Sequence, residues 1–314
     1  MADVTIQPLY TILGAGGVIA EELTNQLVEH QQRVRLVSRS PKSVAGITDL
    51  VAADITDYEQ TRNAVKGSAV VFLTAGLQYN IKIWSVAWPR IMTNVINACK
   101  EANARLVFFD NVYAYGLVDG PMKEDTPYRP SSKKGAIRAA IATQLMDEVK
   151  AGNITATIAR AADFYGPGAD KTGFLNLLII DKFKKNGSAM WLGRDDKTHS
   201  YTFTRDAGKA LYLLSQDESS WNQVWHLPTA NPAPDGKGYM QLIAGQMGVK
   251  PRYMKLNAFM LGLVGLFDTT IKELKEMLYQ SNYPYIFDAT KFEQHFKVKP
   301  TSYEEGIRLT LDKK

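Results

Sequence analysis

The chain has 314 residues, of which 45% are hydrophobic and 22% are charged, a composition typical of globular proteins and not of disordered or fibrous ones. Its 37 Lys and Arg residues outnumber its 32 Asp and Glu residues, giving a net charge of +5, but the basic residues are scattered along the sequence. This scatter argues against the dense basic surface of a nucleic-acid-binding protein, so no nucleic-acid partner is expected.

The sequence also bears on disulfide bonds, metal sites and membrane helices, through its cysteines, histidines and apolar runs. The single cysteine, Cys99, cannot form an intramolecular disulfide, and the four histidines lack metal-ligand spacing, so no metal site is expected. The N-terminus shows no basic start followed by an apolar run. The longest apolar stretch, residues 256–267, is shorter than the roughly 20 residues of a membrane helix. We therefore expect a cytoplasmic protein without a membrane partner.

Short apolar runs alternate with helical patterns through the first half of the chain. Ile19, Leu23 and Leu27 recur every four positions and predict a helix, and a second apolar stripe extends from Trp88 to Cys99, which places Cys99 in packing. This alternation predicts βαβ units on a Rossmann-like, doubly wound parallel sheet of the α/β class. The expected strands are residues 10–13, 34–37, 50–53, 69–73, 106–109 and 156–159.

The regular alternation stops at about residue 165, where Gly, Pro and Lys become more frequent. We expect a dinucleotide-binding domain over residues 1–165 and a smaller C-terminal substrate-binding lobe over residues 166–314. Residues 200–230 are expected to return to the first domain. The apolar segment 259–267 is interpreted as a lid, a core helix or a surface for self-association.

A glycine-rich turn directly follows the first expected strand. Its sequence is Gly14-Ala15-Gly16-Gly17-Val18-Ile19-Ala20, and it leads into the first expected helix. Gly14 permits a tight turn, Gly17 lets the backbone approach a pyrophosphate at the helix N-terminus, and Ala20 keeps helix and strand close. A Gly triplet alone can be a purely structural turn, but the strand before it and the helix after it favour a dinucleotide site.

The end of the second expected strand indicates which dinucleotide binds. An acidic residue there would accept hydrogen bonds from a ribose 2′-hydroxyl, whereas an Arg would pair with a 2′-phosphate. The sequence reads Ser38-Arg39-Ser40-Pro41-Lys42, without a carboxylate. Arg39, together with a hydroxyl from Ser38 or Ser40, therefore favours NADP over NAD. The alternative is a solvated Arg39 on a surface turn.

Further motifs follow in order along nearly the whole chain. They are Gly14-x-x-Gly17-x-x-Ala20, Asp54-Ile55, Leu73-Thr74-Ala75-Gly76, Asn94, Tyr115-Gly116 and Phe164-Tyr165-Gly166-Pro167-Gly168. On these residues the chain resembles the extended short-chain dehydrogenase/reductase family, which contains nucleotide-sugar epimerases and dehydratases, over about residues 8 to 311.

The resemblance implies roles for residues outside the glycine turn. Asp54 and Ile55 would contact adenine, Thr74 to Gly76 would lie beneath the cofactor, and Asn94 would occupy the helix where the family usually has Asn. It also implies homodimers formed through two long helices. The expected cofactor-binding residues are Gly14, Ala15, Gly16, Gly17, Val18, Ile19, Ser38, Arg39, Asp54, Ile55, Thr74, Ala75, Gly76 and Asn94.

The expected active site departs from the family pattern. Asn111 stands where members of the family have Ser or Thr, and the best alignment replaces the YxxxK pair with Lys134 and Arg138. In the usual mechanism a Tyr, its pKa lowered by the Lys, exchanges a proton with the substrate as hydride passes to or from nicotinamide. The chain therefore resembles an atypical branch of the family.

Four residues are candidates for catalysis in this altered active site, namely Tyr113, Lys134, Asn111 and Arg138. Lys134 would donate a proton if burial and nearby cations such as Arg138 lowered its pKa. Tyr113, at a position where dehydratases of the family place an acid/base, would replace the missing Tyr, and Asn111 would hydrogen-bond a substrate carbonyl. Each residue also has a structural alternative. Tyr113 would be an aromatic side chain packed under the cofactor, Asn111 a turn residue, and Lys134 and Arg138 part of a solvated basic first turn of a helix.

A group of basic residues, Arg129, Lys133, Lys134 and Arg138, is expected to form an anion pocket beside the nicotinamide. Such a pocket would suit a phosphorylated or carboxylated substrate.

Two functions compete at this point. The first is an NADP-dependent oxidoreductase or epimerase that acts on a small hydroxyl- or carbonyl-bearing substrate of anionic character. The second is a non-catalytic NADP-binding sensor or assembly protein of the same fold. In the smaller lobe, Asp163 stands where relatives often have a substrate-contacting Asn, and His199 is interpreted as a surface or satisfied residue.

Overall fold

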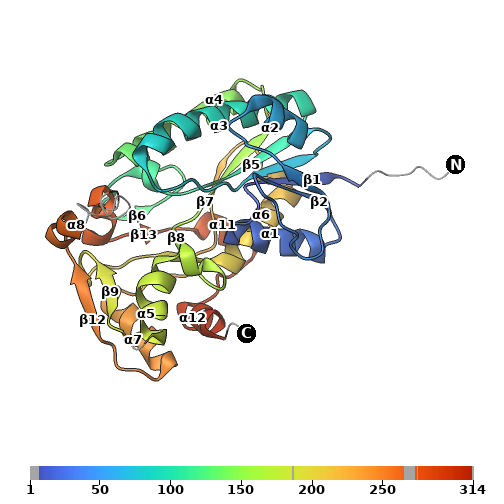
Figure 1. Ribbon diagram of the computed structural model, residues 1–314. Helices are drawn as coiled ribbons and strands as arrows, with labels where there is room; N and C mark the ends of the chain where they lie inside the picture. Colours follow the sequence, from blue (N-terminus) through green and yellow to red (C-terminus); the bar gives the residue numbers. More distant parts are fainter. Residues whose placement is uncertain (1–6, 186, 265–272, 274, 313–314) are drawn as a thin grey trace.

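The computed structural model describes residues 7–185, 187–264, 273 and 275–312. Its centre is a seven-stranded sheet composed of β1 (Leu9–Leu13), β2 (Arg33–Ser38), β3 (Leu50–Ala52), β4 (Val70–Leu73), β5 (Arg105–Asp110), β7 (Ala156–Arg160) and β11 (Val224–His226). The strands are parallel and have the spatial order β11-β7-β5-β4-β1-β2-β3 (Figure 1). The predicted α/β class and Rossmann-like sheet are confirmed.

The central strands are buried on both faces. Every residue of β1, β4 and β7 is buried, because helices cover the sheet from both sides. In the register of the sheet, Leu13 at the end of β1 lies opposite Val37 of β2 and Leu73 of β4. The carboxyl ends of these strands therefore meet at one edge, where the loops that follow them can form a common site.

Two groups of helices sandwich the sheet (Figure 1). One face carries α2 (Tyr58–Val65), α3 (Ile81–Ala102) and α4 (Lys133–Lys150), and the other carries α1 (Val18–Glu29), α6 (Thr204–Gln216) and α11 (Thr290–Phe296). Helices α1 and α6 approach closely because Gly208 has no side chain; a Cβ there would lie 2.6 Å from Cβ of Glu22. Cys99 is fully buried in the core under α3, as its apolar stripe predicted.

A second, smaller layer lies beyond the carboxyl edge of the sheet (Figure 1). We use the term smaller layer for the parallel strand pairs β8 (Asp163–Tyr165) with β10 (Tyr201–Phe203) and β9 (Ala189–Leu192) with β12 (Tyr253–Leu256), and for helices α5 (Asp181–Lys184), α7 (Gly236–Met247) and α12 (Tyr303–Leu311). It has its own aromatic core, in which the Tyr303 ring contacts the rings of Tyr165 and Tyr239.

Short elements complete the chain. They are the strand pair β6 (Pro121–Met122) with β13 (Ile286–Phe287), helices α8 (Ala258–Val264) and α10 (Tyr279–Asn282), the π-helical turn η3 (Asn176–Ile180), and the 3-10 turns η1 (Tyr113–Tyr115), η2 (Ala169–Lys171), η4 (Glu218–Ser220) and η5 (Lys275–Met277). The apolar segment expected at 259–267 is helical from Ala258 to Val264, and its residues 265–267 lie outside the described residues.

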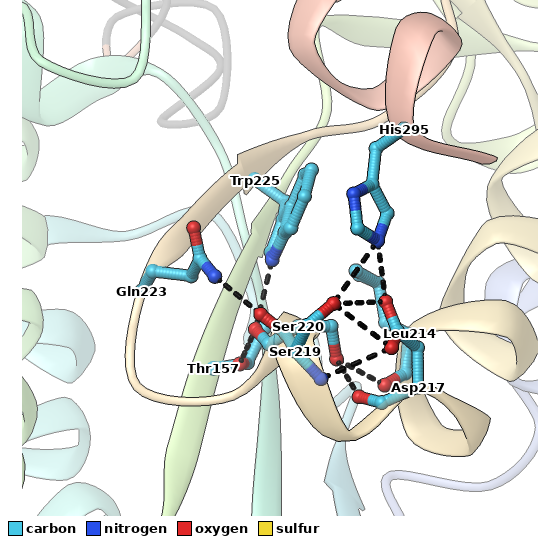
Figure 2. Close-up of polar contacts among 8 residues, drawn as sticks. All are labelled: Thr157, Leu214, Asp217, Ser219, Ser220, Gln223, Trp225 and His295. Carbon is cyan, nitrogen blue, oxygen red and sulfur yellow. Dashed lines mark hydrogen bonds and ion pairs between the residues drawn. The ribbon is translucent and has the colours of Figure 1, made fainter.

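The C-terminal part of the chain returns to the large sheet at β11 and α11. Figure 2 shows the polar contacts at this junction, where the His295 ring of α11 meets the Asp217 carboxylate at the end of α6. Beside it, the Trp225 indole of β11 donates a hydrogen bond to the backbone oxygen of Ser220 over 2.8 Å. The first contact joins α11 to the end of α6, and the second joins the edge strand β11 to η4.

Membrane-spanning helices and metal sites are two features that would indicate a class of function. None of the helices within the described ranges combines the length and the hydropathy needed to cross a membrane. In the same residues, no group of three or more His, Cys, Asp and Glu side chains is placed to hold a metal ion.

Candidate functional site

A large cleft runs between the carboxyl edge of the sheet and the smaller layer, and its volume is about 670 Å³. Its lining begins at the glycine turn with Gly17 and continues past the ends of β4, β5 and β7. It ends at residues of the smaller layer and at Leu261 of α8. In open parallel sheets, ligands bind at this edge.

The glycine turn has the geometry of a phosphate cradle. Gly14 has φ +103° and approaches the backbone after β4 so closely that a Cβ would lie 2.4 Å from Cα of Ala75. Gly16 has φ +101° and, like Gly17, is exposed with open space where a side chain would stand. Gly17 also caps α1 without a side-chain hydrogen bond to the first turn. The free N–H groups at this helix end therefore face open space, which fits an anionic pyrophosphate.

Residues of the expected cofactor site extend along both sides of this turn. Ala15 lies within the turn, and Val18, Ile19, Thr74, Ala75 and Gly76 line the cleft with Gly17. Thr74 is held by its own N–H, which donates to the Leu13 carbonyl oxygen over 2.9 Å. The end of β4 is thereby fixed against the end of β1, directly beside the glycine turn.

The expected adenine and ribose contacts lie at the ends of β2 and β3. Ser38 is the last residue of β2, and Arg39 after it is exposed and forms no ion pair within the described part of the chain. The Thr56 N–H and hydroxyl donate to Asp54, and these bonds, with a smaller effect of Arg39, lower the pKa of that carboxyl. The side-chain amide of Asn94 donates to the Ile55 carbonyl oxygen over 3.1 Å, so Asn94 supports this loop from α3.

Asn111 and Tyr113 follow β5 and reach the middle of the cleft. The Asn111 side-chain oxygen accepts the Tyr113 N–H over 3.0 Å, as expected of a turn residue. The Asn111 side-chain nitrogen has no partner within the described residues and is available as a donor. The Tyr113 ring stacks on Trp84, with ring centroids 6.4 Å apart, so Tyr113 both packs in the wall and faces the cleft.

The electrostatic surroundings of Tyr113 keep its phenol protonated. Burial, followed by the neighbouring Tyr79 and Asp163 side chains, raises the pKa of the Tyr113 phenol well above its usual value of 10.0. The cation that would lower this pKa in the resembled family is missing here, because the nearby Lys134 is engaged elsewhere.

Lys134 is fully buried at the start of α4 and is not among the described residues that line the cleft. Its ammonium donates to the carboxylates of Glu273 and Glu276, the latter over 2.6 Å, and lies 4.5 Å from the centre of the Tyr79 ring. Two carboxylates of the chain accept hydrogen bonds from this ammonium, so Lys134 is held in a structural contact outside the cleft lining formed by the described residues.

Arg138 lines the cleft, but its charge is also compensated. Its Nε donates to Asp110 over 2.8 Å, and Arg160 donates to the second oxygen of the same carboxylate over 3.0 Å. The three side chains are buried, with 0 to 4% of their surface exposed. This Arg-Asp-Arg cluster connects α4, β5 and β7 below the middle of the cleft.

The expected anion pocket is therefore not assembled. Lys134 and Arg138 face carboxylates of the chain, while Arg129 and Lys133 are exposed and do not appear in the lining formed by the described residues. The interpretation failed because the carboxylate partners, Glu273, Glu276 and Asp110, are distant from these basic residues in the sequence.

The buried His199 and the half-buried Asp163 form a pair near Tyr113. The His199 ring nitrogen Nε2 lies 2.9 Å from the Asp163 carboxylate, and the ring stacks on Tyr285 with centroids 4.2 Å apart. Asp163 lines the cleft, whereas His199 is a buried, satisfied residue and not a surface one. Tyr79 and Trp84 also line the cleft and were missed, although they continue the segment after β4 that the family motif identifies.

Comparisons with known proteins agree with this geometry. The model of the NAD-dependent epimerase/dehydratase family matches residues 10–225, more than half of the chain. The chain belongs to this family. The matched range holds the glycine turn, Asn111, Tyr113 and Asp163, whereas Leu256 and Leu261 at the far end of the cleft lie beyond it.

Two curated relatives in this family illustrate its range. Cinnamoyl-CoA reductase 1 of Petunia hybrida is 36% identical over 110 residues, which are 31% of this chain and 33% of that protein. The dTDP-glucose 4,6-dehydratase of Mycobacterium tuberculosis is 28% identical over 200 residues, which are 56% of this chain and 60% of that protein. The matches thus span less than two thirds of either relative.

Solved structures of epimerases and dehydratases share the fold over nearly the whole chain. The UDP-glucose 4-epimerase of Thermus thermophilus, solved with NAD, has a TM-score of 0.79 at 17% identity and covers 97% of this chain and 98% of its own. The dTDP-glucose 4,6-dehydratase DesIV of Streptomyces venezuelae, also solved with NAD, has a TM-score of 0.78 at 16% identity, with 96% and 95% covered.

Proposed function

We propose that the chain is an NADP-preferring oxidoreductase that interconverts a carbonyl and a hydroxyl group on a small substrate by hydride transfer. The observation that carries this proposal is the continuous cleft that joins the exposed glycine turn to Asn111 and Tyr113. A phosphate cradle and two polar side chains along the same cleft are the parts that hydride transfer requires.

The residues present fit a dinucleotide. Gly14 to Ile19, with the first turn of α1, would hold the pyrophosphate. The adenine would be held by Asp54, Ile55 and Asn94, and Thr74 to Gly76 would lie beneath the cofactor at the edge of the sheet. When bound, the cofactor supplies a hydride for reduction or accepts one for oxidation. The chain supplies the orientation of the substrate and the proton.

The preference for NADP rests on Arg39. Its exposed guanidinium follows the end of β2 next to Ser38 and forms no ion pair in the described part of the chain, although it is near enough to Asp54 to lower the pKa of that carboxyl. A guanidinium at this position favours a 2′-phosphate through charge-assisted hydrogen bonds. The solved relatives hold NAD, so this preference would distinguish the chain from them.

Tyr113 provides the proton. Burial raises the pKa of its phenol well above 10.0, so the phenol is protonated at neutral pH and can donate to the oxygen of a carbonyl substrate. The carbonyl carbon receives the hydride, the electron pair of the C=O π bond moves to the oxygen, and the oxygen takes the Tyr113 proton. The free side-chain nitrogen of Asn111 holds that oxygen in place.

Lys134 and Arg138 act in this proposal as positioning residues. Lys134 holds Tyr79 through its ammonium above the ring, and Arg138 holds Asp110, whose carboxylate also accepts the Asn111 N–H over 2.8 Å. Both side chains thereby fix the loop that carries Asn111 and Tyr113.

The proton role is tested with Tyr113→Phe, using oxidation of NADPH in the presence of a panel of aldehydes and ketones. We expect kcat to fall by about 100-fold or more, because a positioned acid contributes at least that much, while the Kd for NADPH stays unchanged. Tyr283→Phe serves as the matched control, since Tyr283 is 51% exposed and does not line the cleft. Equal activity of wild type and Tyr113→Phe would remove Tyr113 from the mechanism.

The cofactor preference is tested with Arg39→Asp, by titrating NADPH and NADH separately. We expect the variant to lose affinity for NADPH and gain affinity for NADH, because a carboxylate repels a 2′-phosphate and accepts from a 2′-hydroxyl. An unchanged preference refutes the assignment to Arg39. Tight NADPH binding without oxidation by any carbonyl compound would instead support the non-catalytic NADP-binding function.

A further inference from the structure

The end of the cleft beyond Tyr113 is walled by apolar side chains. They come from elements that are distant in the sequence: the turn before η3, η3 itself, strands β9 and β12, and helix α8. The residues are Phe174, Leu177, Leu178, Met190, Leu192, Leu256 and Leu261. On β9 the alternation is clear, because Ala189 and Trp191 are buried in the smaller layer whereas Met190 and Leu192 are half-buried and face the cleft.

The charged groups at this end of the cleft offer little counter-charge to an anionic substrate. Two cations line the cleft among the described residues, and of these Arg138 is paired with Asp110, whereas Lys171 is an exposed residue of η2. A carboxylate lies in the surroundings of Tyr113, since Asp163 lines the cleft and raises the pKa of the phenol. A carboxylate or phosphate on the substrate would lose its hydration here and face Asp163, and the one lining cation without an ion pair among the described residues is the exposed Lys171 of η2.

We propose that the substrate is a carbonyl compound with an apolar aliphatic or aromatic body, without a phosphate, carboxylate or nucleotide next to the reacting group. This inference rests on the proposed function, because the reacting carbonyl is the one that Asn111 and Tyr113 hold. It replaces the expected anionic substrate. It also separates the chain from the structural relative of Thermotoga maritima, which was solved with UDP-glucose.

The inference is tested by binding of two amides that cannot be reduced, so that no turnover is needed. The protein, loaded with NADP⁺, is titrated calorimetrically with benzamide and with 4-carbamoylbenzoate, which adds one carboxylate to the same ring. We expect benzamide to bind at least about 100-fold more tightly, because the carboxylate enters an apolar, negatively charged end of the cleft.

Substitution of Met190 tests whether the apolar wall of the cleft causes the preference for benzamide. Met190→Lys conserves the length of the side chain and adds an ammonium to the apolar wall, and we expect it to narrow the ratio of the two Kd values by about 10-fold or more. Val86→Lys is the control: Val86 of α3 is 62% exposed and does not line the cleft. It should leave the ratio unchanged. Leu178→Lys replaces Met190→Lys if near-UV circular dichroism shows that the latter fails to fold.

Three results would overturn the inference: equal affinity for the two amides, tighter binding of the carboxylated amide, or no binding of either at about 10 mM. Reduction assays distinguish a wrong substrate class from a wrong proposed function. Preference for benzamide without NADPH oxidation by benzaldehyde would preserve the substrate class and refute the activity. Equal reduction of benzaldehyde and 4-carboxybenzaldehyde would preserve the activity and refute the substrate class.

Discussion

The buried cluster of Arg138, Asp110 and Arg160 makes a quantitative prediction about stability. In Asp110→Asn the side chain keeps its size but loses its charge, and two guanidinium groups lose their common anion. The Asp110 and Arg160 side chains are fully buried and that of Arg138 is 4% exposed, so water cannot replace the carboxylate. Removing one partner of a buried ion pair costs about 3–5 kcal/mol, and the aromatic rings beside both guanidinium groups do not replace a counter-ion.

We expect Asp110→Asn to lower the free energy of unfolding by about 3–5 kcal/mol, measured by urea denaturation followed by far-UV circular dichroism. Asp49→Asn is the matched control, because Asp49 also pairs with an arginine, Arg35 at 3.1 Å, but its side chain is 40% exposed. Its loss should cost about 1 kcal/mol or less. A loss in Asp110→Asn as small as that in the control would refute the argument that burial makes this cluster essential.

Two further predictions concern the glycine turn and a buried histidine. Gly14→Ala should destabilise the fold by about 1–3 kcal/mol more than Gly67→Ala, and it should also weaken NADPH binding. Both glycines have positive φ, but only at Gly14 would an added Cβ meet backbone atoms. Equal thermal unfolding of the two variants would contradict this. Burial, with a smaller effect of Arg160, lowers the pKa of His226 to about 3. Because the unfolded chain takes up the proton first, stability should fall as pH drops from about 6.5 toward 3, by up to about 1.4 kcal/mol per pH unit. His226→Gln should show a shallower decline in urea titrations at pH 7, 6 and 5, and an identical slope would rule out His226 as its source.

The large sheet could be predicted because its signals are local. Each apolar run lies next to its turn and helix in the sequence, so βαβ units could be recognised from strands such as β1 and helices such as α1. Strand β11 was not among the expected strands, since Val224–His226 is too short to show a pattern. The glycine turn was predictable for the same local reason, including the tight turn at Gly14, which has φ +103°.

The charge environment of the site could not be predicted, because it depends on contacts between distant residues. Lys134 is paired with carboxylates 139 and 142 positions later, and Arg138 with one 28 positions earlier. From the sequence alone, both cations look free. The apolar wall has the same origin, since Met190 and Leu256 become neighbours only when β9 and β12 pair.

The path of the chain between the large sheet and the smaller layer constrains how the cleft can open. The backbone passes from one to the other after β7, before α6, after β11 and before α11, and Thr301 near α12 also donates to Asp206 of α6 over 2.7 Å. A lobe joined by one linker could swing open as a rigid flap about a single hinge. Here such a rotation would have to bend several connections at once, so ligands would enter through local displacement at the rim of a preformed cleft.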